Sequence, residues 1–123
     1  MVKTASQVGK EGEEIAEGFL ESKGYKILSR NWKTPRWGEV DIVALDKDQL
    51  VFAEVKTRTT LWAGEPLEAV GFHKLRTLKR AALYFKESHP ETPDGLRIDV
   101  LSVVLGNPPE IQHFPSVYED TLN

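Results

Sequence analysis

A short apolar run that ends in an acid and a base is the feature that most constrains the fold of this chain. The run, Leu50-Val51-Phe52-Ala53, leads directly into Glu54-Val55-Lys56. Alternate side chains of an extended strand share a face, which places Glu54 and Lys56 about 6.6 Å apart on one side and turns Val55 toward a core. The pattern therefore predicts a buried strand with a charged end.

A second strand precedes this one. Residues 39–45 have strand character, and a turn-like segment, 46–49, joins them to the apolar run. If the two strands form a hairpin, Asp41 lies opposite the Glu54 end of its partner. Two carboxylates and the ammonium group of Lys56 would then converge.

Such a cluster predicts a metal site, because neighbouring carboxylates raise each other's pKa unless a cation keeps them ionised. Mg²⁺ and Mn²⁺ prefer oxygen ligands, and Mg²⁺ usually binds one or two protein carboxylates together with water and substrate phosphate. A metal would activate a water and neutralise a phosphodiester, while Lys56 positions the nucleophile or stabilises the same charge. The alternative for an isolated Glu-x-Lys is an ordinary salt bridge at a strand end.

Composition favours a single domain over residues 1–123. The chain has 123 residues and no cysteine, which excludes thiol catalysis, disulfides and cysteine zinc sites. Its polar start and the lack of a membrane-length apolar run predict a soluble cytoplasmic protein without a membrane partner. Residues 1–4 and 116–123 are expected to be mobile ends.

Basic residues are concentrated in one segment. The net charge is −3, yet residues 72–86 contain five Lys and Arg and no acid. Their periodicity predicts an amphipathic helix on which Lys74 lies at the edge of the apolar stripe, facing the sheet and within reach of the carboxylates. The outward basic stripe is either a nucleic-acid surface or a solubilising face. It comprises His73, Arg76, Lys79, Arg80 and Lys86.

An earlier amphipathic helix is expected at about residues 6–23. Glu13 lies at the border of its apolar stripe, but Glu11 lies equally near the other border, so periodicity does not choose between them. A solvated helix face is the alternative for either acid.

The remaining segments complete a mixed sheet flanked by helices. With further strands at 25–32, 97–105 and 110–114, the order is α-β-β-β-α-β-β, with three antiparallel strands and a helical crossover to the fourth. The connection 57–71 is a candidate lid, whose Trp62 either stacks on a base or packs on the core. Asp99 is expected in a structural salt bridge, and the three histidines lack metal-binding spacing.

Several motifs in combination resemble the bacterial YraN-like family. They are Gly12-Glu13, Arg30-Asn31, Gly38-Glu39-Val40-Asp41 and Phe52-Ala53-Glu54-Val55-Lys56-Thr57-Arg58, and the match covers about residues 8–104. This family is similar to PD-(D/E)xK nucleases and archaeal Holliday junction resolvases, which implies a restriction-endonuclease-like core and Mg²⁺- or Mn²⁺-dependent hydrolysis of DNA. Val40 departs from the motif, which has proline there, and Glu39 would either assist the metal or line its rim.

The resemblance also implies roles for individual residues. Asp41 and Glu54 would bind the metal, with the Val55 carbonyl as a further ligand and Glu13 as the helix acid that completes the site. Lys56 would be the catalytic lysine. Lys74 would contact phosphate, and the residues expected to bind nucleic acid are Lys74, Arg76, Lys79, Arg80 and Arg58.

Three functions are compatible with these patterns. The leading hypothesis is a metal-dependent endonuclease selective for junction or branched DNA in recombination or repair. The second is a DNA-binding accessory module with the same fold and little or no turnover, and the third is a small interaction protein with ordinary salt bridges. A homodimer would suit a substrate with paired scissile sites, although the sequence identifies no pairing surface.

Overall fold

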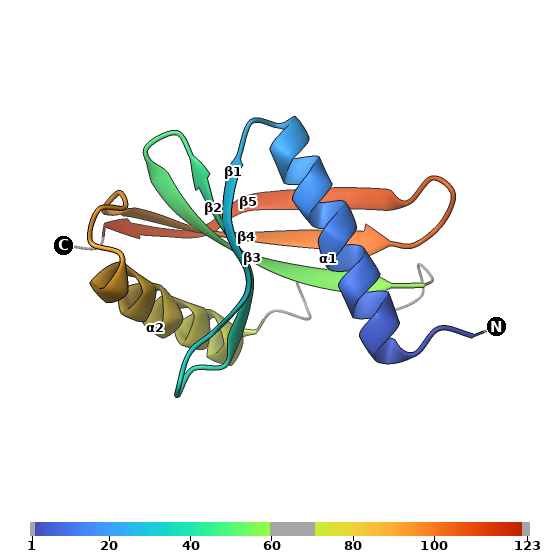
Figure 1. Ribbon diagram of the computed structural model, residues 1–123, viewed down its shortest axis with the longest axis horizontal. Helices are drawn as coiled ribbons and strands as arrows, with labels where there is room; N and C mark the ends of the chain where they lie inside the picture. Colours follow the sequence, from blue (N-terminus) through green and yellow to red (C-terminus); the bar gives the residue numbers. More distant parts are fainter. Residues whose placement is uncertain (1, 60–70, 122–123) are drawn as a thin grey trace.

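A computed structural model describes residues 2–59 and 71–121 as a five-stranded mixed sheet with two helices (Figure 1). The strands lie in sequence order, with β3 and β4 parallel and all other neighbours antiparallel. The predicted α/β class, element order and crossover through the basic helix are therefore confirmed. The elements are α1 (Ala5–Ser22), β1 (Lys26–Lys33), β2 (Glu39–Asp46), β3 (Gln49–Arg58), α2 (Phe72–Ser88), β4 (Gly95–Val104) and β5 (Glu110–Thr121).

Two strands are longer than expected. β3 continues to Arg58, alongside β4, and residues 60–70 of the expected lid, with Trp62, lie outside the described residues. β5 continues past Phe114 to Thr121, so residues 116–121 of the expected mobile end form its last part. The reason is tertiary: β5 pairs with β4 along its length, as far as Gly95, and these backbone hydrogen bonds compensate for its weak local strand pattern.

The two faces of the sheet carry separate apolar clusters. Leu50 and Phe52 of β3 belong to the cluster that includes α2, whereas Val51 and Ala53 belong to the cluster that includes α1. This alternation follows from the two-residue period of a strand. Each helix therefore covers one face of the sheet.

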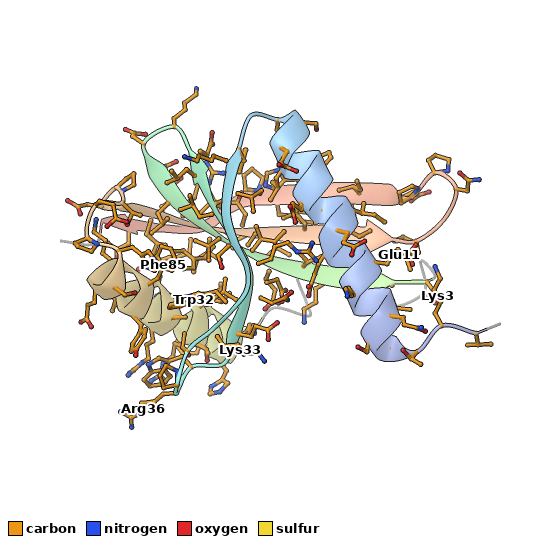
Figure 2. All side chains as sticks on the ribbon, in the orientation of Figure 1. Lys3, Glu11, Trp32, Lys33, Arg36 and Phe85 are labelled. Atoms are coloured by element: carbon orange, nitrogen blue, oxygen red, sulfur yellow. The ribbon has the colours of Figure 1, made fainter. Side chains whose placement is uncertain are left out.

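Contacts between aromatic rings pack α2 against its face of the sheet. The ring centroid of Phe85 lies 5.6 Å from that of Phe52 and 5.0 Å from that of Trp32, both in edge-to-face geometry. Figure 2 shows Trp32 and Phe85 on the side of the sheet that α2 covers. Neither described helix is both long and apolar enough to span a bilayer.

The start of α1 is set by a capping box. The Gln7 N–H donates to Thr4 Oγ1 at 3.1 Å, and the Thr4 N–H donates to Gln7 Oε1 at 2.8 Å. After the helix, Gly24 has φ +92°, a left-handed conformation that glycine adopts without strain. These local signals orient a helix whose buried face rests on β3.

Close contact between α1 and β3 depends on Gly12. A Cβ atom at this position would lie 1.8 Å from Thr57 Oγ1 and 2.6 Å from Thr57 Cβ. Rotation of the Thr57 side chain cannot relieve the second contact, so an added methyl group must separate the helix from the strand. Gly12 thus lets the neighbouring Glu13 lie near the sheet.

Gly12→Ala is expected to lower the free energy of unfolding by about 1–3 kcal/mol through overpacking. Urea denaturation measures this loss. The matched control is Gly18→Ala, because a Cβ at Gly18 meets nothing within 4 Å. There the higher helix propensity of alanine should raise stability by up to about 1 kcal/mol. Equal stability of the two variants would contradict the close contact.

Candidate active site

The start of β2 and the end of β3 bring two carboxyl groups together. The register pairs Ile42 with Ala53, so Asp41 and Glu54 occupy the next positions of their strands. The Val55 N–H donates to Asp41 Oδ2 at 2.8 Å, and the carboxyl group of Glu54 is within hydrogen-bonding reach of Asp41. The predicted convergence of the two acids is confirmed.

The pair has unusual electrostatics. Burial raises the pKa of Asp41 to about 8, and the hydrogen bond with Glu54, its charge and the charge of Glu13 add to this increase. The Val55 N–H acts in the opposite direction. At neutral pH the carboxyl group of Asp41 is therefore mostly protonated when no cation is bound.

Lys74 reaches this pair from α2. Its Nζ lies 3.0 Å from Glu54 Oε2, as expected for a lysine that faces the sheet. That oxygen is buried and accepts no hydrogen bond of good geometry from the described residues. The contact with Lys74 is therefore an ion pair whose angles do not suit a hydrogen bond. Glu54 thus retains an incompletely satisfied buried oxygen beside Asp41.

The neighbours of Glu54 on β3 lie as their alternation predicts. Lys56 is half-buried on the same strand face as Glu54, whereas Val55 packs into the cluster under α1. Arg58, at the end of the strand, donates from Nη2 to Ser102 Oγ of β4 at 3.4 Å. Two lysines therefore lie on the face of the sheet that carries the carboxyl pair, Lys56 on β3 and Lys74 on α2.

An asparagine joins the helix acid to the sheet. Asn31 Nδ2 donates to Glu13 Oε1 at 2.7 Å and to Glu39 Oε1 at 2.8 Å. Asn31 has φ +50°, which asparagine tolerates better than most residues. Glu11, which the helical period does not separate from Glu13, instead pairs with Lys3 (Figure 2). The structure thus places Glu13 near the site. Asparagine is uncommon inside strands, so Asn31 within β1 is the sequence feature that points to this bridge.

The donor set suits a hard divalent cation. In residues 2–59 and 71–121 no three His, Asp or Glu side chains are close enough together to hold a metal. Mg²⁺, however, usually takes only one or two protein carboxylates and completes its coordination with water and substrate. Asp41 and Glu54 match this requirement. The buried Glu54 Oε2 accepts no hydrogen bond from the described residues, and a bound cation would satisfy it instead. Glu13 is held nearby through Asn31.

The predicted basic stripe of α2 does not stay together: Lys86 pairs with Asp94 at 3.0 Å, and the other members lie against two different neighbours. Arg76 and Arg80 are exposed, and Arg80 Cζ lies 4.7 Å from the ring centroid of Trp37 in the β1–β2 connection. Lys79 Nζ lies 4.0 Å from the ring centroid of Tyr118 in β5. Successive helical residues are rotated by about 100°, which directs Lys79 and Arg80 to different flanks. Only Arg76 and Arg80 therefore extend toward the β1–β2 connection.

Comparison with known proteins gives the family. A model of the "Uncharacterised protein family UPF0102" matches residues 12–103, a range that contains the whole carboxylate site. The chain belongs to the UPF0102 family. This confirms the resemblance to the YraN-like family, which is the same family.

Relatives in this family match along most of their length. A UPF0102 protein of Arthrobacter sp. (strain FB24) is 46% identical over 112 residues, covering 89% of this chain and 94% of the relative. One of Renibacterium salmoninarum is 40% identical over 114 residues, with 91% and 96% covered. One of Syntrophotalea carbinolica is 43% identical over 113 residues, with 91% of each chain covered.

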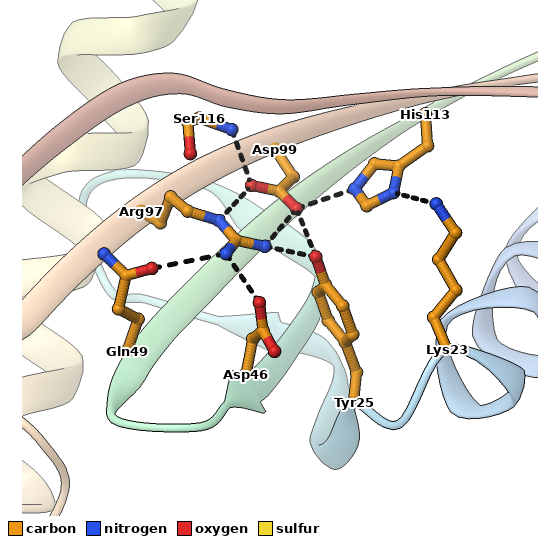
Figure 3. Close-up of polar contacts among 8 residues, drawn as sticks. All are labelled: Lys23, Tyr25, Asp46, Gln49, Arg97, Asp99, His113 and Ser116. Carbon is orange, nitrogen blue, oxygen red and sulfur yellow. Dashed lines mark hydrogen bonds and ion pairs between the residues drawn. The ribbon is translucent and has the colours of Figure 1, made fainter.

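This UPF0102 chain has a second polar cluster, at β4 (Figure 3). Arg97 donates two hydrogen bonds to Asp99, each 2.9 Å long, and one of 2.7 Å to Asp46. His113 Nε2 donates to Asp99 at 2.7 Å, and Tyr25 contacts Arg97. Burial alone would raise the pKa of Asp99, but the hydrogen bonds from His113 and Arg97 lower it to about 2. The predicted structural salt bridge of Asp99 is confirmed.

Asp41→Asn is expected to flatten the pH dependence of stability in the metal-free UPF0102 protein. The folded-state pKa of Asp41, about 8, exceeds its ordinary value of 3.8. The stability that this group contributes is therefore full below about pH 4 and is lost as the pH rises toward about 8. Urea denaturation in EDTA at several pH values measures the effect.

The control for this prediction is Glu14→Gln, which alters an exposed acid on α1. It should keep the pH dependence of the parent protein. A loss of stability between about pH 4 and pH 8 that is equal in the parent and in Asp41→Asn would show that Asp41 is not the titrating group.

Proposed function

We propose that this protein is a metal-dependent endonuclease that hydrolyses DNA phosphodiester bonds, selecting junction or branched DNA in recombination or repair. The observation that carries the proposal is the pair of half-buried Asp41 and buried Glu54, with Lys74 in contact with Glu54 and Lys56 on the same strand face. The resemblance of the sequence motifs to those of PD-(D/E)xK nucleases supports the same chemistry. Asp41 and Glu54 would hold Mg²⁺ or Mn²⁺, with Glu13 and the Val55 carbonyl as further ligands.

The residues of the chain would have distinct tasks. A divalent cation would neutralise charge on the scissile phosphate and make a water more acidic. Lys56, on the strand face of Glu54, would orient the attacking water or stabilise negative charge on the phosphate. In the metal-free structure Lys74 forms an ion pair with Glu54. When a cation binds Glu54, Lys74 would instead contact a substrate phosphate.

A second candidate function is a DNA-binding accessory module with little or no turnover. The Lys74–Glu54 ion pair favours it, because this contact offsets the charge of Glu54 without any metal. The two candidates differ in what they require. Cleavage needs the carboxylates and a cation, whereas binding by the accessory module would survive in EDTA and weaken with salt.

The test is cleavage of labelled four-way junctions, flaps, single strands and plain duplex in Mg²⁺, Mn²⁺ or EDTA. Metal-dependent products from one of these shapes would support the endonuclease and identify its substrate. No product from any of them, together with salt-sensitive binding, would favour the accessory module. Sedimentation of the free and DNA-bound protein would test a homodimer, as suits a substrate with paired scissile sites.

A further inference from the structure

A small hollow lies between the β1–β2 connection and α2. Its volume is about 190 Å³, and its lining consists of Trp37, His73, Arg76, Thr77 and Arg80. Pockets that bury a drug-sized ligand have volumes of about 300–1,000 Å³. The hollow therefore suits one flat group inserted from a larger molecule rather than a complete small molecule.

The surroundings of this hollow are cationic and aromatic. Arg80 and Arg36 lie with their Cζ atoms 4.7 and 5.6 Å from the ring centroid of Trp37, and Arg76 lies 6.0 Å from that of Phe72. Phe72 is 75% exposed. In the described part of the chain none of these three arginines forms an ion pair with a carboxylate. Figure 2 shows Arg36 at the tip of the β1–β2 connection.

Trp37 is held in place. Its backbone N–H donates to Thr34 Oγ1 at 2.7 Å, and its ring packs partly against the cluster under α2. A fixed aromatic ring beside unpaired cations is the combination that binds single-stranded nucleic acid, since a base stacks on the ring and phosphates bind the cations. Bases inside a duplex are already stacked and do not offer this contact.

We infer that this surface binds unpaired nucleotides of a DNA substrate, with one base stacked on Trp37 and the adjoining phosphates on Arg76 and Arg80. The inference rests on the proposed function for its choice of DNA. The same helix carries Lys74 to the carboxylate pair, so unpaired nucleotides would lie beside the cleaved bond. Lys79, directed toward Tyr118, lies outside this surface.

The experiment measures anisotropy of a labelled oligothymidine strand and of a duplex, in EDTA, so that no cleavage is needed. Trp37→Leu and Trp37→Phe both keep an apolar side chain against the core, but only phenylalanine keeps an aromatic face. Trp37→Leu should weaken single-strand binding about tenfold, and Trp37→Phe should restore most of it. Duplex affinity should stay within about twofold in both variants. Thermal unfolding confirms that both are folded.

A second pair of variants tests the cations. Arg76→Ala combined with Arg80→Ala should weaken single-strand binding and reduce its salt dependence by about two counterions. Lys10→Ala removes an exposed cation from α1, on the other face of the sheet, and as the control it should change single-strand affinity less than about twofold. Competition by poly-glutamate as strong as that by unlabelled oligothymidine would show charge attraction alone and overturn the inference.

These outcomes separate the inference from the proposed function. If Trp37→Leu and Trp37→Phe bind the single strand equally, or if Trp37→Leu weakens duplex and single strand alike, the stacking site is wrong even when the parent cleaves DNA. If the parent cleaves nothing but shows the expected difference between the two variants, the nuclease proposal fails and the binding surface stands.

Discussion

Glu54→Gln is expected to lower the metal-dependent cleavage rate on the order of 10³-fold, the upper range for removing one group that stabilises transition-state charge. Glutamine keeps the volume of the side chain and removes its negative charge. The cation would lose a ligand, and Lys74 would lose the partner that now lies 3.0 Å away. Single-turnover cleavage across a Mg²⁺ titration measures the loss.

The fold should survive this substitution. The charge of Glu54 is one cause of the raised pKa of Asp41, so its removal relieves a repulsion between two neighbouring acids. Glu14→Gln, on the exposed side of α1, makes the same chemical change away from the site and should leave the rate unchanged. Lys56→Ala should also lower the rate. Cleavage by Glu54→Gln at the rate of the parent would show that the carboxylate pair takes no part in catalysis.

Asp99→Ala is expected to have the largest effect on stability, lowering the free energy of unfolding by about 3–5 kcal/mol. The side chain of Asp99 is fully buried and that of Arg97 nearly so. Removing the carboxylate leaves the guanidinium with Asp46 and takes away the hydrogen-bond acceptor of His113. A buried charge that loses its partner costs far more than the pair contributes.

Urea denaturation of Asp99→Ala beside Asp94→Ala measures this difference. Asp94 pairs with Lys86 at 3.0 Å, but its side chain is 54% exposed, and its loss should cost only about 0–1 kcal/mol. Similar losses in the two variants would show that the cluster at β4 does not support the fold.

The same cluster predicts acid sensitivity. The folded-state pKa of Asp99, about 2, lies below its ordinary value of 3.8. Its contribution to stability is therefore present above about pH 4 and is lost as the pH falls toward about 2. Asp99→Ala should lack this part of the acid transition.

The local sequence pattern was sufficient to predict the helices and strands and the central residues of the site. The period of two in residues 50–56 placed Glu54 and Lys56 on one face and Val55 in the core, and the turn 46–49 aligned Asp41 with them. The helical period of residues 72–86 placed Lys74 toward the sheet, where it pairs with Glu54. These features depend on neighbours within one strand, one hairpin or one helix, which a sequence displays directly.

Only the tertiary structure decided the features that join distant segments. Periodicity left Glu11 and Glu13 equivalent; the family resemblance favoured Glu13, and the bridge through Asn31 gives the physical reason. The full length of β5 depends on pairing with β4, and the hollow at Trp37 depends on how α2 packs beside the β1–β2 connection. The sequence by itself determined which residues share a face, whereas the packing of elements determined which faces meet, because such contacts join residues that no local period relates.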